Sequence, residues 1–407
     1  MRRGGIGQSG AKSIMARGDG AAGEAAAGWR LFLLWLAGID LRLTILAVPP
    51  VLPLIHHQLG LDEKSVAALT GLPVLLFAVI AVPGSLLIAR LGARRAVLAG
   101  LVTVALSSAL RGLGPSVTML FVMTFVMGAG VSIIQPALPA LVSRWFPSRI
   151  ALATAVYANG LLVGEVLSAA LTLPLVLPLM GNWEWSFAFW GVPVLATALL
   201  IAFGTPHVAP AAQAARLRWW PDWRDARTWQ LGVLQGGGSA LYFASNAFIP
   251  DYLHAIGRPE LVNACLTALN SGQVPASLLV LLFARQLAGR KSPLILAGFS
   301  GLVSLGGLLS GMPWAMIAGA AVIGFAAAFV LILTLALPPM LTPPEDVHRL
   351  SAGVLTISYA LAFIVPFLGG AVWDATAVPA TAFLPGAVGA LMVLLLGASL
   401  RPIHGAR

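Results

Sequence analysis

The sequence predicts an all-α polytopic membrane protein with twelve transmembrane helices, arranged as two pseudo-symmetric six-helix bundles around a central cavity. Three observations predict this class: the composition, a series of long apolar runs, and the distribution of basic residues. Of 407 residues, 59% are hydrophobic and 9% are charged, and the mean hydropathy is +0.92. A soluble domain carries about 25% charged residues. A water-soluble core cannot hold so much apolar sequence, so we expect the chain to lie in a lipid bilayer.

Twelve apolar runs are long enough to cross a bilayer. Lipid admits only helices or closed barrels, because backbone polar groups must be paired internally. Runs as uniformly apolar as these predict helices. The predicted spans are 31–55, 64–89, 96–113, 116–142, 150–178, 185–204, 229–255, 260–284, 292–311, 314–341, 349–373 and 379–400.

The segments outside the spans are predicted from their composition. Residues 1–28 are rich in Gly and Ala, are basic and lack an apolar core, which predicts a disordered cytoplasmic tail. Residues 401–407 are predicted to form a second cytoplasmic tail. The connection 205–228 contains three prolines and four arginines, and it separates a first bundle (29–204) from a second (229–400). Near Trp219–Trp229 it is expected to be either an amphipathic surface helix or a plain linker.

The basic residues test the number of spans. If the N-terminus is cytoplasmic, 20 of the 24 Lys and Arg residues fall in cytoplasmic segments and one, Arg42, falls in a span. The other three, Lys64, Arg111 and Arg258, fall outside. This distribution follows the positive-inside rule. We therefore expect both termini on the cytoplasmic side of a bacterial inner membrane. The distribution also accounts for the net charge of +10 without a nucleic-acid partner.

The two bundles repeat each other in sequence. Arg90-Leu-Gly-Ala-Arg-Arg follows the second span, and Arg285-Gln-Leu-Ala-Gly-Arg-Lys follows the eighth. Parallel six-span repeats are typical of transporters that bind their substrate near the middle of the bilayer, between the repeats.

Several motifs match one family of membrane proteins. The loop after the second span contains Arg90, Gly92, Arg94 and Arg95. The spans contain Asp40-Leu-Arg42, Thr70-Gly-Leu-Pro73, Ile134-Gln135-x-x-x-Pro139, and Ser358-Tyr359 with Pro366. With these motifs the chain resembles the major facilitator superfamily, and within it the cyanate and nitroimidazole permease branch. It departs from that pattern at Ala89, where an acidic residue is usual, and at Asp40, where Asn is usual.

The resemblance implies the fold of that superfamily and secondary active transport by alternating access. It implies a small anion or a small nitrogen-containing organic solute as substrate. It also implies a conformational role for the loop motif of Arg90, Gly92, Arg94 and Arg95.

Arg42 is the first candidate for the substrate site. Helical rise places it roughly 16 Å into the first span, near the centre of a hydrocarbon layer about 30 Å thick. A cation at that depth is costly, so it is expected to face protein or water. Its guanidinium can bind a carboxylate-like anion through two parallel hydrogen bonds. The alternative is a structural ion pair, or a bond to carbonyls freed by the prolines at 49, 50 and 53.

Two carboxylates in the spans, Asp40 and Glu165, are candidates for proton coupling. Asp40 and Arg42 are two positions apart and do not share a helix face. Asp40 therefore points toward a neighbouring helix or, if the span is unwound, toward the cavity. Glu165 is placed roughly 24 Å above Arg149 by helical rise. A carboxyl group in an apolar setting can take up a proton reversibly; the alternative for Glu165 is a buried pair with Arg42.

Other large polar groups lie well inside the spans. Each either lines the cavity or forms an interhelical hydrogen bond, which is common in membrane bundles. With Arg42, the predicted substrate-binding set is Gln135, Tyr157, Asn159, Asn246, Asn270 and Tyr359; Tyr242 and Gln273 are of the same kind.

The predicted function is secondary transport by a monomer in the bilayer, coupled to protons, with a small-molecule substrate. The alternative is an exporter of neutral or cationic aromatic compounds, for which acidic and aromatic groups without a central arginine are expected. No metal-ligand spacing, nucleophile constellation or nucleotide-binding loop occurs in the sequence. We therefore predict no enzymatic activity, cofactor or metal, and rank a channel low.

Overall fold

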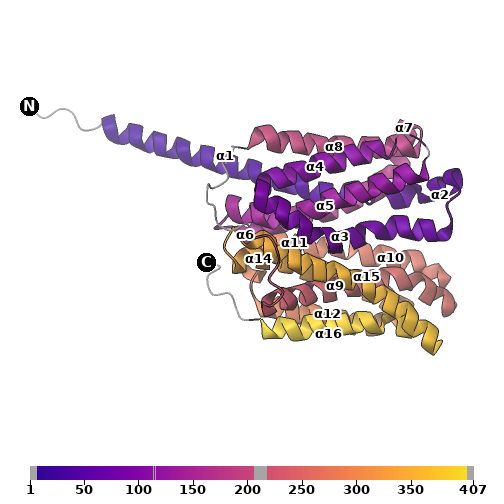
Figure 1. Ribbon diagram of the computed structural model, residues 1–407. Coiled ribbons are helices and arrows are strands. Elements are labelled where there is room, and N and C mark those ends of the chain that lie inside the picture. The colour runs from indigo at the N-terminus through magenta and orange to yellow at the C-terminus, as the bar shows by residue number, and fades with distance from the viewer. Residues whose placement is uncertain (1–6, 113, 115, 206–217, 401–407) are drawn as a thin grey trace, which may run out of the picture.

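The computed structural model describes residues 7–112, 114, 116–205 and 218–400, and in these residues every regular element is a helix (Figure 1). The first half of the molecule contains α1 (Gly7–Leu43), α2 (Val48–Leu59), α3 (Glu63–Leu91), α4 (Ala93–Leu110), α5 (Val117–Trp145), α6 (Ile150–Leu171), η1 (Thr172–Val176), α7 (Leu177–Met180) and α8 (Trp183–Gly204). The second half contains α9 (Ala226–Ala255), η2 (Pro259–Leu261), α10 (Val262–Ser271), α11 (Gln273–Leu287), α12 (Lys291–Leu308), α13 (Pro313–Leu335), α14 (Leu337–Leu341), α15 (Val347–Thr376), η3 (Pro379–Phe383) and α16 (Leu384–Ser399).

The described residues cross the molecule twelve times. Eleven helical segments are long and apolar enough to span a membrane. The twelfth crossing is α9, which has 30 residues and packs against α13, α15 and α16. Its glycines and polar residues lower its hydropathy below that of the other spans. The predicted all-α polytopic fold with twelve spans is confirmed, and the predicted span boundaries lie close to the observed helix ends.

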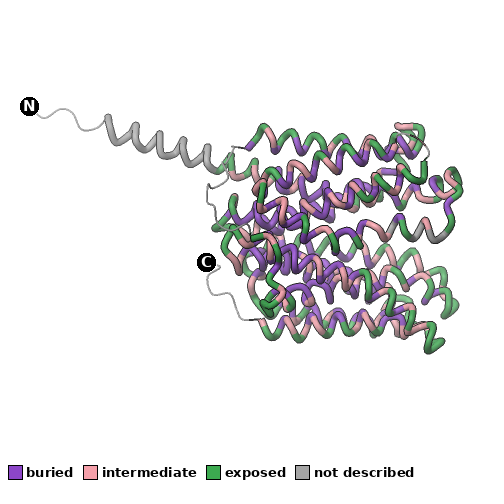
Figure 2. Tube along the Cα trace, in the orientation of Figure 1, coloured by how far each residue is buried: buried purple, intermediate pink, exposed green. Residues whose placement is uncertain are grey.

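The helices run side by side, so the molecule has two end faces (Figure 1). We call the end where α3, α5, α8 and α16 finish the terminal face, and the opposite end, which carries the turns at Gly60, Gly181 and Ala377, the distal face. Buried residues concentrate along the interior of the bundle and exposed ones along its outside (Figure 2). Large apolar side chains such as Phe203 and Phe367 are exposed on that outside, as lipid contact requires.

The two halves repeat each other in backbone conformation. Every described residue with a positive φ angle occupies a turn that has a counterpart 196 or 197 positions away. The pairs are Gly60 and Gly257, Gly92 and Gly289, Gly114 and Gly311, and Gly181 and Ala377. Seven of the eight are glycine, which adopts this region at no steric cost. Ala377, with φ 55°, is the exception.

Close helix packing within each half depends on small residues. A Cβ atom added to Gly160 or Gly164 on α6 would meet the backbone of Trp35 or Ile39 on α1. In the second half, a Cβ atom on Gly237 of α9 would meet the backbone of Gly389 on α16. Small residues let helix backbones approach closely in membrane bundles, where apolar burial supplies no force between helices.

The predicted tails and connection are described only in part. Residues 1–6, 206–217 and 401–407 lie outside the described residues. Residues 1–28 were predicted to form a disordered cytoplasmic tail; α1 begins at Gly7, and the state of this tail stays a prediction. In the connection, residues 218–225 form turns and α9 begins only at Ala226. The described part of the connection therefore contains no amphipathic surface helix.

Candidate functional site

Arg42 lies in the last turn of α1, immediately before a break in the first span. The chain forms turns over residues 44–47 and becomes helical again at Val48. Pro49 and Pro50 begin this second segment and have no N–H groups to donate to the preceding turn. The sequence therefore ends the helix just beyond the arginine, where its side chain faces the boundary between the halves.

The guanidinium of Arg42 lies beside an aromatic pair formed by both halves of the protein. Its Cζ atom lies 5.9 Å from the centroid of the Phe77 ring on α3. The ring of Tyr359 on α15 lies beside Phe77, with 5.0 Å between the two ring centroids. The Nε atom of Arg42 is buried and has no hydrogen-bond partner among the described residues. Arg42 thus has a free donor beside two aromatic rings.

A second polar cluster surrounds Tyr242 on α9. The Tyr242 hydroxyl donates a hydrogen bond to Asn270 Oδ1 at 2.6 Å and lies 3.5 Å from Glu165 Oε1. Gln273 Nε2 donates to the same hydroxyl at 3.2 Å, and Asn246 is within hydrogen-bonding reach of it. A phenol has one proton to donate. Asn270 and Glu165 therefore compete for the single Tyr242 proton.

Glu165 and Arg42 lie near enough to act on each other's charge. They are nevertheless not among the ion pairs of the described residues, which are Arg218 with Asp346, Arg258 with Glu260, and Arg349 with Asp346. The alternative of a direct Arg42–Glu165 salt bridge does not hold in this conformation. Among the described residues, the side chain that hydrogen-bonds Glu165 is Tyr242 of the other half, with its hydroxyl 3.5 Å from Glu165 Oε1.

Asn159 has both of its polar atoms engaged. Its Oδ1 atom accepts a hydrogen bond from Trp35 Nε1 at 3.0 Å, and its Nδ2 atom donates to Ser277 Oγ at 2.8 Å. These bonds join α6 to α1 and to α11, so Asn159 bridges the two halves. The sequence left two alternatives for Asn159, a cavity-lining residue or an interhelical hydrogen bond. The geometry supports the interhelical hydrogen bond.

The remaining predicted polar residues are buried at several places. Tyr157 on α6 is 2% exposed, and its hydroxyl has no partner among the described residues. Gln135 on α5 is also buried. Asp40 is 2% exposed inside the first half, and its Oδ2 atom is buried without a partner among the described residues. It therefore points toward a neighbouring helix and away from Arg42, as the two-residue spacing requires.

Arg111 is not at the surface, although the distribution of basic residues assigned it to an outer segment. Its side chain is completely buried, and its Cζ atom lies 4.4 Å from the centroid of the Phe187 ring. Its Nη2 atom donates to the Thr44 carbonyl at 2.9 Å and to Ser108 Oγ at 3.2 Å. Sequence reasoning missed this role, because an arginine at the end of an apolar run is typical of a membrane-surface position.

The loop motif after α3 fastens one helix end. Arg94 donates through Nε to Thr205 Oγ1 at 2.7 Å, and through Nη2 to the carbonyls of Ile201, Ala202 and Thr205. These are acceptors left free at the end of α8, where a positive charge is also favourable. Gly92, at φ 81°, makes the turn that places Arg94. Arg90 and Arg95 are exposed.

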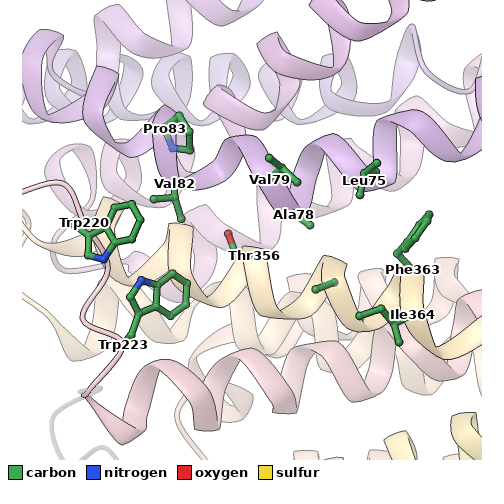
Figure 3. A pocket seen from close by; sticks show the side chains of 11 residues that line it. Leu75, Ala78, Val79, Val82, Pro83, Trp220, Trp223, Thr356, Phe363 and Ile364 are labelled. Atoms are coloured by element: carbon green, nitrogen blue, oxygen red, sulfur yellow. The ribbon is translucent and has the colours of Figure 1, made fainter.

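One hollow is well defined, and the predicted site residues do not line it. It has a volume of about 520 Å³ and lies between α3 and α15 (Figure 3). Its lining is almost entirely apolar: Leu75, Ala78, Val79, Val82, Pro83, Trp220, Trp223, Thr356, Ala360, Phe363 and Ile364. In the described residues, no group of three His, Cys, Asp or Glu side chains is placed to hold a metal ion.

The halves meet along several helices. Helix α15 packs on α3 and α5, α11 packs on α6, and α14 packs on α5. The distal elements α2, α7 and α10 make their main contacts within their own halves. The eighth span is divided at Gly272, and its α11 part packs on α6 of the first half.

Two six-helix halves that share a polar boundary define a multi-pass membrane transporter. A family model, described as Major Facilitator Superfamily, matches residues 31–257. The chain belongs to this superfamily, and the predicted fold and family are thereby confirmed. Because the superfamily consists of transporters, the prediction that the chain is not an enzyme is confirmed as well.

Curated relatives and a solved structure agree with this assignment. The chain is 29% identical over 348 residues to the cyanate transport protein CynX of Escherichia coli (strain K12), covering 84% of this chain and 88% of that protein. It is 27% identical over 363 residues to the 2-nitroimidazole transporter of the same organism, covering 88% and 91%. The crystal structure of the superfamily transporter FucP in the outward conformation superposes with a TM-score of 0.72 at 15% identity, covering 92% of this chain and 99% of that one.

Proposed function

We propose that this chain is a proton-coupled secondary transporter that binds a small anion, or a small nitrogen-containing organic solute, through Arg42. The observation that carries the proposal is the Nε donor of Arg42, buried and without a partner among the described residues, at the boundary between the halves. A guanidinium binds planar acceptors such as carboxylate-like groups through parallel hydrogen bonds. The relatives named for cyanate and 2-nitroimidazole support both solute classes, since cyanate is an anion and a nitro group presents two acceptor oxygens.

The groups around Arg42 come from both halves, so their distances depend on the conformation of the transporter. Arg42 and Phe77 belong to the first half, whereas Tyr359 and Tyr242 belong to the second. Rocking of the halves about a central site changes the separations between these groups. A solute bound to Arg42 then stabilises one arrangement over the other by its different contacts in each.

Glu165 is the proposed proton acceptor. It lies 3.5 Å from the Tyr242 hydroxyl, whose proton is shared with Asn270. A protonated Glu165 donates a hydrogen bond of its own, so the cluster has a different bonding pattern in each protonation state. Asp40 is the second proposed candidate: it is buried inside the first half, and its Oδ2 atom has no partner among the described residues.

We further propose that both termini are cytoplasmic and that the chain acts as a monomer. The excess of Lys and Arg in the segments on the terminal side supports this orientation.

The test is uptake into proteoliposomes. Labelled cyanate and 2-nitroimidazole are offered with and without an inward proton gradient, to the wild type, Arg42→Gln and Glu165→Gln. The control is Arg258→Gln, which changes an exposed ion pair with Glu260 and is expected to transport normally. We expect Arg42→Gln to lose saturable uptake. Glu165→Gln should keep solute exchange but lose accumulation driven by the gradient.

Normal uptake by Arg42→Gln would place the anion site elsewhere. Normal gradient-driven accumulation by Glu165→Gln would remove this residue from proton coupling. Saturable transport of neutral or cationic aromatic compounds alone would instead support the exporter.

A further inference from the structure

The apolar groove lies between α3 of the first half and α15 of the second, and Arg42 does not line it. Val79 of α3 is 60% exposed in it, and Phe363 and Ile364 of α15 are 46% and 47% exposed. Leu75 and Pro83 lie at its two ends along α3, about 12 Å apart by helical rise. Both helices are membrane-spanning segments. The groove is therefore open to the hydrocarbon of the bilayer and has the length of a stretch of acyl chain.

The two ends of the groove are lined by different kinds of side chain. Trp220 and Trp223 close it toward the terminal face, and Leu75 and Phe363 lie at the other end, toward the middle of the bilayer (Figure 3). Tryptophan is typical of the level where hydrocarbon meets the lipid headgroups. A chain lying in the groove thus has its headgroup beside the two tryptophans and its tail toward Phe363.

The tryptophan end is held rigidly by three helices. Ser85 Oγ of α3 donates to the Trp219 carbonyl at 2.8 Å, and Arg349 Nε of α15 donates to the Trp220 carbonyl at 2.9 Å. Trp229 Nε1 of α9 donates to the Trp223 carbonyl at 2.9 Å. Segment 218–225 is therefore a fixed wall of the groove that touches both halves.

Exposed arginines surround this end of the groove. With Arg349, five arginines lie on or next to this segment or at the neighbouring end of α3: Arg90, Arg218, Arg224, Arg227 and Arg349. The acidic groups are Asp222, Asp225, Glu345 and Asp346. Asp222 and Asp225 accept hydrogen bonds from the backbone N–H groups of Arg224 and Arg227. Asp346 pairs with Arg349 at 2.8 Å and with Arg218 at 4.0 Å, and this longer pair leaves the Arg218 side chain 71% exposed. Basic clusters of this kind next to membrane helices attract anionic lipid headgroups.

We propose that the groove binds one anionic glycerophospholipid, with an acyl chain between α3 and α15 and its phosphate beside Arg218 and Arg224. This lipid bridges the first half, through α3, and the second half, through α15. The proposal does not depend on the substrate of the transporter or on its coupling ion.

The test is lipid binding to the full-length chain, measured by native mass spectrometry. The delipidated protein is titrated with phosphatidylglycerol or with phosphatidylethanolamine in detergent micelles. We expect one phosphatidylglycerol to remain bound under activation that strips the other lipids, and no phosphatidylethanolamine. Val79→Trp fills the groove and should abolish this adduct. Its control, Val303→Trp, changes an equally exposed apolar position on α12 (58% exposed) and should retain it.

The headgroup is tested separately. Arg218→Gln combined with Arg224→Gln should weaken phosphatidylglycerol binding by about tenfold or more, whereas Arg258→Gln on the distal face should not. Equal retention of the two lipids by the wild type, or an undiminished adduct in Val79→Trp, would overturn the proposal. Loss in Val79→Trp with no effect of the arginine changes would show an acyl-chain site without headgroup recognition, and would also overturn it.

Discussion

Arg111 donates a hydrogen bond from Nη2 to the main-chain carbonyl of Thr44 at 2.9 Å. In a continuous helix the N–H of Val48 would bond this carbonyl. At the break in the first span, Val48 N–H instead donates to Ile45 at 3.3 Å. Arg111 therefore supplies the donor that the break removes, two residues beyond Arg42. This contact fixes the end of the helix segment that presents Arg42 to the boundary between the halves.

We predict that Arg111→Met destabilises the protein by about 1–3 kcal/mol, because the Thr44 carbonyl is left buried without a donor. It should also raise the KM for solute more than it lowers the maximal rate, since Arg42 stays in place but is less firmly held. Thermal unfolding in detergent and uptake kinetics measure the two effects. Arg111→Lys keeps one charged donor and should recover part of the stability. A Met variant as stable as the wild type would contradict this account.

Gly164 and Gly306 form a matched pair for testing helix packing. A Cβ atom on Gly164 would meet the backbone of Ile39, whereas a Cβ atom on Gly306 meets nothing within 4 Å. Gly164→Ala should therefore cost about 1–3 kcal/mol through overpacking of α6 against α1. Gly306→Ala should be neutral or stabilise α12 by up to about 1 kcal/mol through helix propensity. Thermal unfolding of both variants checks the prediction, which fails if Gly164→Ala is as stable as Gly306→Ala.

Ala377 has φ 55°, although its counterpart in the first half is Gly181. An alanine in the left-handed region costs about 1 kcal/mol relative to glycine. Ala377→Gly should therefore stabilise the protein by up to about 1 kcal/mol. Two residues earlier, Ala375 is inside α15, and Ala375→Gly should destabilise by roughly 0.5–1 kcal/mol. The two variants should shift the melting temperature in opposite directions. Shifts of the same sign would contradict the view that the positive φ angle at position 377 favours glycine.

Arg94 holds the end of α8 through its bonds to Thr205 and to the carbonyls of Ile201 and Ala202. Arg94→Gln should loosen this end, because the carbonyls lose a charged donor. Hydrogen exchange of the amides in the last turn of α8 should become faster. The exposed neighbour Arg90 provides the control, since Arg90→Gln removes a charge from the same loop without touching α8. Equal exchange in both variants would show that Arg94 does not fasten the helix.

The number and order of the spans followed from the sequence by itself. Lipid requires long, continuous apolar helices. Turn residues and charged residues interrupt these apolar runs, so they show where each span ends. The cost of a cation at mid-bilayer similarly pointed to Arg42. The motifs at Arg42, Arg90 and Tyr359 carried the resemblance to the superfamily.

The neighbours of each side chain were decided only by the tertiary structure. The spans are apolar almost all round, so their sequences contain no polar stripe that says which face turns inward. Rotation of α1 placed Asp40 inside the first half and Arg42 over Phe77, and the packing of α9 made Tyr242 the centre of a polar cluster. Asn159 became a bridge and Arg111 a buried donor for the same reason. The role of a residue in a span depends on the side chains of the helix that packs against it. Those side chains are distant in the sequence, so the local sequence does not specify them.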